Sequence, residues 1–517
     1  MALARDITTV GSGTLISRLL AFARDAGIAA WLGTTPFSEA LFAMLQVINF
    51  FRRLLADGAL NGAFVPIWLT LRAAEDGETN ANRFTWRSLL AMLCISSIAA
   101  LIVVVLAPIV VRIIAPGFDE TARDLTAFLL VIAAPYILLA GLVAVIAAAL
   151  NAEKRVVAVT ISTVIFNVVM VAAVAFTIGT DIFLFEFTLV LTGAIVFAGL
   201  VQLLVTGSVW LMTSKRWRRV RICMPNQTQT LFVRAVPGLI AAGIPQLKLI
   251  AASAIVSSSP AALSWLYYAN RLYELPLGVA SIAIAATIVP RIAASLLAGD
   301  AAGFAASQSR AFEIALGLAL PAATGFALLA EPIAGGLFQR GAFTPADTAA
   351  VAAALTAICA GLPGHVLEKV FGAVSFAHED THTPMIAALT GLAAAIIGGV
   401  LLFPHFGYVG VAAGVAISGW VGAALLGGVL YRRGWLRLDL IAARRLPRIV
   451  LATSVMGMAV GYALVAAHML FPAVAVNSPR QLAMLFALVA LGLVVYLAAL
   501  QILGVAKLKD LIAALRS

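Results

Sequence analysis

Eight lysines and arginines interrupt segments of the sequence that are otherwise almost wholly apolar. Each would cost about 2.5–3.5 kcal/mol at the centre of a bilayer. Eight of them facing lipid would exceed the ~5–15 kcal/mol net stability of a typical folded protein. They must therefore face a wet cavity, pair with acidic side chains, or reach the membrane surface from a segment end. The eight are Arg18, Arg24, Arg52, Arg53, Arg234, Lys248, Arg271 and Lys369.

The chemistry of these groups favours an anionic substrate. A guanidinium group donates paired hydrogen bonds in a planar fork that matches phosphate, and it stays charged at physiological pH. A cavity that holds several arginines therefore predicts binding of a phosphate or diphosphate. An exporter of cations would instead place carboxylates at its centre.

Acidic residues in the same segments leave a purely structural interpretation open. Arg53 and Asp57 are four residues apart, so they could neutralise each other on one helix face. The pair Arg271 and Glu274, three apart, has the same alternative, as does the pair Arg18 and Asp25, seven apart. The candidate acidic partners are Asp25, Glu39, Asp57, Glu274 and Glu368.

The composition predicts a polytopic helical membrane protein. Of 517 residues, 63% are hydrophobic and only 11% are charged, less than half the ~25% typical of soluble domains. The net charge of +11 is not clustered on a soluble module, so we expect no nucleic-acid partner. The five histidines and three cysteines show no metal-ligand or disulfide spacing. We expect no metal and no cofactor.

Apolar runs bounded by turn or charge signals give fourteen candidate spans. An even number places both termini on one side of the membrane. Segments on that side hold 22 lysines and arginines, and opposite segments hold four, so the positive-inside rule predicts cytoplasmic termini. The spans are 7–33, 37–71, 88–113, 123–150, 156–178, 182–213, 229–257, 261–290, 305–338, 347–376, 383–403, 408–431, 447–470 and 481–505.

A repeat with an offset of about 225 residues indicates a duplication. Val65-Pro66 matches Val289-Pro290, Pro116-Gly117-Phe118 matches Gly341-Ala342-Phe343, and Pro135 matches Pro363. An even number of spans separates the copies, so the halves share one orientation, an arrangement in which transporters bind substrate between the halves. The predicted parts are an N-terminal lobe (1–213), a cytoplasmic linker (214–228), a C-terminal lobe (229–431) and two appended spans with a tail (432–517).

Several segments closely resemble the MurJ (MviN) family of lipid II flippases. The resemblance begins with two long segments, SRLLAFARDAGIAAWLG (17–33) and NFFRRLLADGALNGAFVPIW (49–68). It continues, in the same order along the chain, with APGF (115–118), APYILL (134–139), WLYYANRLYELPLGV (265–279), GAFT (341–344) and EKVFGAVSFAHEDTHTP (368–384). The similarity covers about residues 1–390 and thereafter rests mainly on hydropathy.

The resemblance implies a fold and a function. The fold would be all-α and MATE-like, with two six-helix lobes in a parallel pseudo-twofold repeat plus two C-terminal helices. The substrate would be lipid II, an undecaprenyl diphosphate bearing a disaccharide-pentapeptide, moved from the inner to the outer leaflet of the bacterial inner membrane by alternating access. Membrane lipids and other cell-wall synthesis proteins are the candidate partners. The last two spans would form a groove for the polyprenyl tail.

The resemblance also assigns roles to residues. The substrate-binding residues are expected to be Arg18, Arg24, Asp25, Arg52 and Arg271. Position 39 is Glu where the family usually has Asp, Asn270 stands where many relatives carry an acid, and His382 replaces a common arginine. The expected charge partners in the cavity are Glu39, Arg53, Asp57, Lys248, Glu274 and Lys369.

Three rival functions remain as alternatives. Two are transporters, a flippase for another lipid-linked oligosaccharide and a MATE-type drug exporter, and the arginine-rich first two spans favour a diphosphate over a cationic drug. The third is a membrane enzyme that uses polyprenyl diphosphates. Such an enzyme needs clustered carboxylates for a metal, or a nucleophile with its base. The sequence has no DxxxD or DDxxD motif, so we expect no enzyme.

Overall fold

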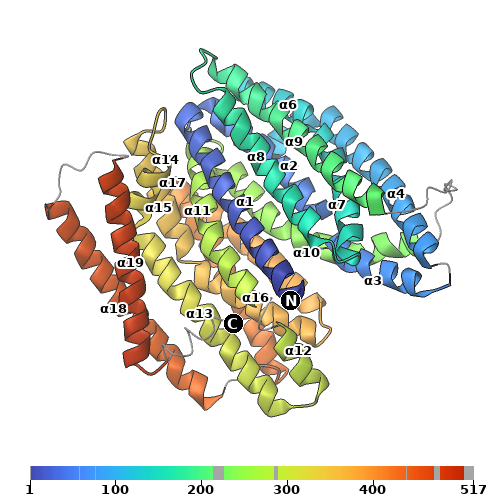
Figure 1. The fold of residues 1–517 in the computed structure, drawn as a ribbon. Helices are drawn as coiled ribbons and strands as arrows, with labels where there is room; N and C mark the ends of the chain where they lie inside the picture. The colour runs from blue at the N-terminus through green and yellow to red at the C-terminus, as the bar shows by residue number, and fades with distance from the viewer. Residues whose placement is uncertain are drawn as a thin grey trace. The chain divides into compact units, whose positions relative to one another are not determined.

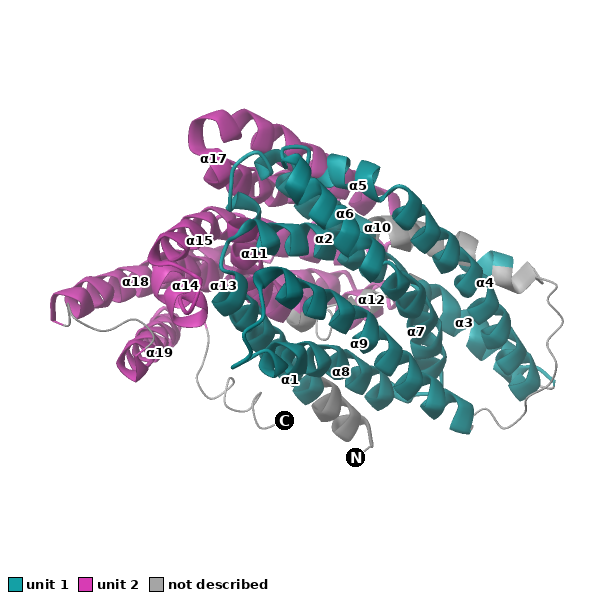
Figure 2. Ribbon diagram, turned by 90° about the horizontal axis from the view of Figure 1, so that it is seen from above, with its two compact units in different colours: residues 1–263 teal, residues 264–517 magenta. Residues whose placement is uncertain are grey.

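A computed structural model describes residues 2–56, 59–75, 77–213, 226–284, 289–437, 439–470 and 478–505. Within these ranges the regular elements are helices (Figure 1). Side chains are described for most of them, the exceptions including residues 2–10 and 232–242. The chain divides into two compact units, Met1–Leu263 and Ser264–Ser517 (Figure 2).

Unit 1 contains the first ten helices. Its last helix, α10, packs against α2 and α3, so it belongs with the N-terminal helices by its contacts. The predicted linker, residues 214–228, falls almost wholly outside the described residues, and the predicted lobe boundaries stay a prediction. The helices are α1 (Ala2–Leu32), α2 (Pro36–Ala56), α3 (Ala59–Ala73), α4 (Gly77–Val105), α5 (Ala107–Ile114), α6 (Glu120–Ala133), α7 (Pro135–Ala152), α8 (Val156–Phe176), α9 (Leu184–Thr213) and α10 (Asn226–Val256).

Unit 2 contains the remaining helices apart from the first two residues of α11. Helices α18 and α19 pack against each other and against α13. The helices are α11 (Ala262–Ala283), α12 (Val289–Leu297), α13 (Ala301–Leu328), α14 (Ala330–Phe338), α15 (Pro345–Cys359), α16 (Leu362–Ala377), α17 (His382–Arg432), α18 (Leu440–Leu470) and α19 (Pro479–Ile502).

Helices in equivalent spans of the two halves are interrupted at equivalent positions of the repeat. The third span breaks at Leu106 and the ninth at Leu329, 223 residues later. The fourth breaks at Ala134 and the tenth at Ala360, 226 residues later. A proline follows each break within a few residues and disfavours helical backbone before it. These breaks support the parallel repeat that the sequence predicts.

Helix α17 is a hairpin of two spans. At Gly407 the backbone has φ 55° and ψ −141°, which only glycine adopts readily. The two arms lie so close that a Cβ at Gly414 would be 2.5 Å from the backbone nitrogen of Gly399. The arms therefore correspond to the predicted spans 383–403 and 408–431.

The surface and the helix lengths are those of a multi-pass membrane protein. Ten helical segments of the described chain are long and apolar enough to cross a membrane. Large apolar side chains such as Ile98, Leu101 and Val105 are more than half exposed. An apolar surface of this kind faces lipid rather than water.

Candidate functional site

Among the predicted cations whose side chains the structure describes, Arg24 on α1 is the most buried. Its Nε and Nη2 donate to Oδ1 of Asp25 at 2.9 and 2.7 Å. On α8, Asn167 accepts from Arg24 Nη1 at 3.5 Å and donates to Ser17 at 2.9 Å. Arg24 is 5% exposed and Asp25 2%. The structure thus holds this charge as a satisfied ion pair where α1 packs against α8.

The other cations of the first two spans are half-buried. Arg18 lies on α1, and Arg52 and Arg53 lie in the last two turns of α2. The Nε of Arg52 donates to Asn49 Oδ1 at 3.3 Å. Asp57, the predicted partner of Arg53, lies outside the described residues. Whether these side chains line one cavity with Arg24 stays a prediction.

Glu39 holds the turn that follows α10. Its Oε1 accepts the backbone N–H of Leu263, the last residue of unit 1, at 3.2 Å, and its side chain is buried. On the same turn, Ser257 Oγ accepts the backbone N–H of Gly117 at 2.8 Å. Among the described residues, Glu39 is bonded to backbone, and its pairing with one of the predicted basic side chains stays a prediction.

A polar seam runs between α2 and α10. Gln46 Nε2 donates to Ser253 Oγ at 2.5 Å, and Gln246 Nε2 donates to the carbonyl oxygen of Gln46 at 3.4 Å. Lys248, one of the predicted cavity charges, lies on the same helix and is 8% exposed. The side chain of Arg234, further back on α10, lies outside the described residues. The sequence singled out Lys248 by its charge, and its place in a cavity stays a prediction, whereas the uncharged seam on the same helix was missed.

In unit 2 the structure confirms the pairing of Arg271 with Glu274. Arg271 Nη1 lies 3.3 Å from Glu274 Oε2, and its guanidinium lies 5.6 Å from the ring centroid of Tyr267. The two side chains of the ion pair are 26% and 28% exposed. Since solvent reaches both, the pair leaves Arg271 accessible to a ligand. Asn270, its neighbour, is half-buried.

A network around His365 was missed from the sequence. Tyr273 Oη lies 2.7 Å from His365 Nδ1, and Ser418 Oγ lies 3.3 Å from His365 Nε2. Glu368 is one turn further along α16 and lies against Gly422. Lys369, the next residue, is exposed. The contacts join three spans that are distant in sequence, so no local spacing could have revealed them.

Helix α17 begins at His382, and Asp380 lies in the connection just before it. Asp380 Oδ1 accepts the backbone N–H groups of His382 and Thr383, both at 3.0 Å. Asp380 Oδ2 accepts from Thr383 Oγ1 and from Arg433 Nη1, both at 2.5 Å. Desolvation works against the charged carboxyl, but these hydrogen bonds and Arg433 bring the pKa of Asp380 from 3.8 to about 2. The motif is therefore a helix cap, and the side chain of His382 is exposed.

Replacing Asp380 with asparagine tests this cap. Because folding depresses the pKa of Asp380, its stabilising effect is present above about pH 4 and is lost as pH falls through about 2. Arg433 is 45% exposed, so we expect Asp380→Asn to cost only about 1 kcal/mol at pH 7. The measurement is the thermal midpoint at pH 7 and pH 3. The exposed neighbour Glu379, changed to glutamine, should alter neither value.

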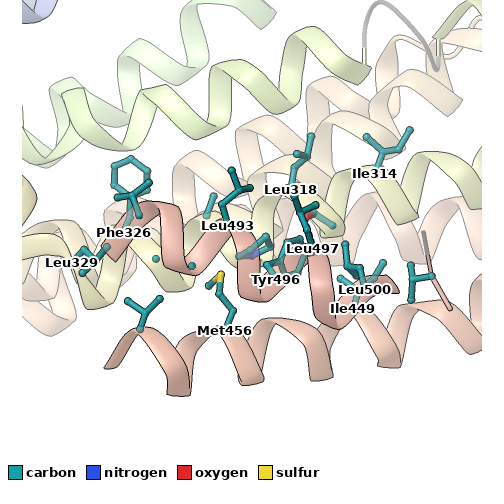
Figure 3. Close-up of a pocket in the computed structure, with 18 of the residues that line it drawn as sticks. Ile314, Leu318, Phe326, Leu329, Ile449, Met456, Leu493, Tyr496, Leu497 and Leu500 are labelled. Atoms are coloured by element: carbon teal, nitrogen blue, oxygen red, sulfur yellow. Dashed lines mark hydrogen bonds between the residues drawn. The ribbon is translucent and has the colours of Figure 1, made fainter. Parts of the chain in front are cut away.

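An apolar groove lies within unit 2, between α13, α14, α18 and α19. Its volume is about 650 Å³. Figure 3 shows Ile314 and Leu318 of α13, Met456 of α18 and Leu493 of α19 lining it. Arg310 and Glu313 line it at the end where α18 begins.

Comparison with known proteins assigns the chain to a family. The family model described as lipid II flippase MurJ matches residues 28–477. A probable lipid II flippase MurJ of Rhizobium meliloti (strain 1021) is 35% identical over 467 residues, which is 89% of this chain and 86% of that protein.

Solved structures show the same fold. A lipid II flippase MurJ in an inward closed conformation has a TM-score of 0.78 at 21% identity, over 97% of this chain and 99% of that one. An inward-facing multidrug resistance MATE family transporter of the MOP superfamily has a TM-score of 0.65 at 15% identity, over 83% and 98%. These likenesses confirm the all-α, MATE-like fold. Together with the match over most of its length, they show that the chain belongs to the MurJ family of lipid II flippases.

Proposed function

We propose that this protein moves lipid II from the inner to the outer leaflet of the bacterial inner membrane by alternating access. The observation that carries the proposal is the retention of Arg24 as a buried ion pair in an apolar helix, in a chain that matches the lipid II flippase family. Moving a diphosphate through hydrocarbon is prohibitive without accompanying cations. We assign this role to Arg18, Arg24 and Arg52 of unit 1 and Arg271 of unit 2.

The groove between α13, α14, α18 and α19 supports the proposal for the other end of the substrate. Its walls are apolar over most of its length, which suits a polyprenyl tail and not a sugar or peptide. The head group would cross inside a cationic cavity while the tail stays in an apolar environment. The excess of basic residues on the side of the termini favours an orientation with both termini in the cytoplasm.

The test is complementation in cells depleted of their own lipid II flippase. We expect Arg52→Ala to lower the amount of lipid II that reaches the outer leaflet by about tenfold or more, because a charge-assisted hydrogen bond to phosphate is lost. Arg83→Ala, at an exposed position of α4, is the matched control and should transport normally. Normal transport by Arg52→Ala at equal protein level contradicts the assigned role. Transport of a different lipid-linked oligosaccharide, and not lipid II, by the wild type would favour the rival flippase.

A further inference from the structure

The groove in unit 2 has one charged end. Arg310 and Glu313 line it there, together with Ile449 of α18 and Leu500 of α19. The rest of the lining is apolar except for the Tyr496 hydroxyl, which donates to the carbonyl oxygen of Gly317 at 2.7 Å. A groove with an apolar body and one charged end has the polarity of an amphipathic lipid.

At this end of the groove Arg310 and Glu313 form an ion-paired triad with Arg445 of α18, which lies next to the lining. Glu313 is 6% exposed and accepts from Arg310 Nη1 at 3.0 Å and from Arg445 Nη1 at 3.2 Å. The three side chains together carry a charge of +1. Within the described part of the chain, Arg310 and Arg445 form side-chain hydrogen bonds to Glu313 alone, each through Nη1. The Nε and Nη2 groups of both arginines are therefore available as donors.

The backbone around the triad is held in place by hydrogen bonds. On α13, Gln308 donates to the carbonyl oxygen of Trp435 at 2.7 Å and accepts the N–H of Arg437 at 2.8 Å. Ser309 accepts the N–H of Asp439 at 2.9 Å. These bonds fasten the connection before α18 to the turn of α13 that carries Arg310. The backbone that carries Arg310 and the connection that leads to Arg445 are therefore held before any ligand arrives, which lowers the entropic cost of binding.

The length of the groove bears on the class of lipid. From Ile314 to Phe326 the lining residues of α13 extend over about 18 Å, at about 1.5 Å per residue. One leaflet of a bilayer offers only about 15 Å of hydrocarbon, half of its total thickness. A groove of this length accommodates a chain that continues past the bilayer midplane. A polyprenyl tail is much longer than a phospholipid acyl chain, so it can fill the groove and extend beyond it.

We propose that Arg310 and Arg445 form a binding site for the phosphate of a polyprenyl phosphate or diphosphate lipid, whose tail lies in the groove. The proposal rests on the proposed function and adds a second phosphate site, separate from the cations of α1 and α2. Glu313 is a positioning residue that orients both guanidinium groups. In the proposed orientation this end of the groove opens at the cytoplasmic side, where a lipid made inside the cell would load.

The test compares two ligands with the same tail, undecaprenyl phosphate and undecaprenol, on the full-length protein in nanodiscs. We expect the double variant Arg310→Gln/Arg445→Gln to bind undecaprenyl phosphate at least tenfold more weakly, since charge-assisted hydrogen bonds are lost. Its affinity for undecaprenol should not change. The control is Arg480→Gln, because Arg480 is exposed at the opposite end of α19 and should not affect either ligand.

The double variant leaves the buried Glu313 without its partners, so a second variant guards against misfolding. Arg310→Gln/Glu313→Gln/Arg445→Gln replaces the charges with amides that can bond to one another, and it should show the same loss. Equal affinity of this folded variant and the wild type for undecaprenyl phosphate overturns the proposal. So does an equal loss in Arg480→Gln, or full displacement of undecaprenyl phosphate by excess phosphatidylglycerol.

A separate measurement distinguishes this proposal from the proposed function. If the wild type fails to move lipid II in a reconstituted assay, the proposed function is wrong. The affinities of the wild type and the variants for undecaprenyl phosphate and undecaprenol still test the second phosphate site. If the wild type moves lipid II and the variants bind undecaprenyl phosphate normally, only the second phosphate site is wrong.

Discussion

Arg24→Ala is expected to reduce lipid II transport to background and to destabilise the protein. The substitution leaves Asp25 as a buried carboxylate, 2% exposed, without the two hydrogen bonds that now neutralise it. Breaking a buried ion pair by removing one partner costs about 3–5 kcal/mol. The measurements are lipid II on the outer leaflet and the thermal midpoint of the purified protein.

A double-mutant cycle separates transport from stability. Arg24→Ala/Asp25→Ala removes both charges, so much of the lost stability should return. Transport should not return, because the proposed role of Arg24 is to exchange Asp25 for a phosphate of the substrate. Arg83→Ala again serves as the unaffected control. If the double variant transports lipid II normally, Arg24 only clamps α1 to α8, and its assignment to the substrate site is wrong.

The fold could be predicted from the sequence because membrane-spanning helices are recognised by their length and hydropathy. The breaks within the spans 123–150 and 347–376 were not predicted, although Pro135 and Pro363, which follow them, were recognised as matching positions of the repeat. The hairpin turn at Gly407 was predicted as a boundary between two spans. The packing of α10 against α2 and α3 was not predicted, because a hydropathy pattern does not show which helices a span packs against.

The candidate site could be predicted from the sequence only in part. Arg271 and Glu274 share a helix face, so spacing identified them as a pair, and they are one. Arg24 and Asp25 are adjacent, and adjacent residues on a helix point about 100° apart. Reasoning from helix faces therefore offered Arg18 as one possible partner of Asp25 and did not consider Arg24, whose side chain is long enough to turn back to its neighbour. Asn167 is 143 residues from Arg24, and only tertiary packing brings them together.

The second large effect is expected from Gly117→Ala, which should destabilise unit 1 by about 3 kcal/mol or more. An added Cβ would lie 2.3 Å from the backbone nitrogen of Ser258 and 2.6 Å from the carbonyl carbon of Ser257. Backbone atoms cannot rotate away as a side chain can, so the turn at 257–261 must shift. That turn leads directly into α11, whose second residue, Leu263, has its N–H bonded to Glu39. The measurement is the thermal midpoint, with lipid II transport per folded molecule as a second readout.

Two further substitutions show why Gly117→Ala destabilises the protein. Gly193→Ala on α9 places a Cβ where no heavy atom lies within 4 Å, and a helix gains up to roughly 1 kcal/mol from this change. Ser257→Ala removes the acceptor of the Gly117 N–H without adding bulk and should cost about 1 kcal/mol. A cost for Gly117→Ala no greater than that for Ser257→Ala would mean that the hydrogen bond, and not the close backbone approach, holds the turn. A larger cost, with transport reduced in the molecules that remain folded, would mean that transport depends on the position of this turn.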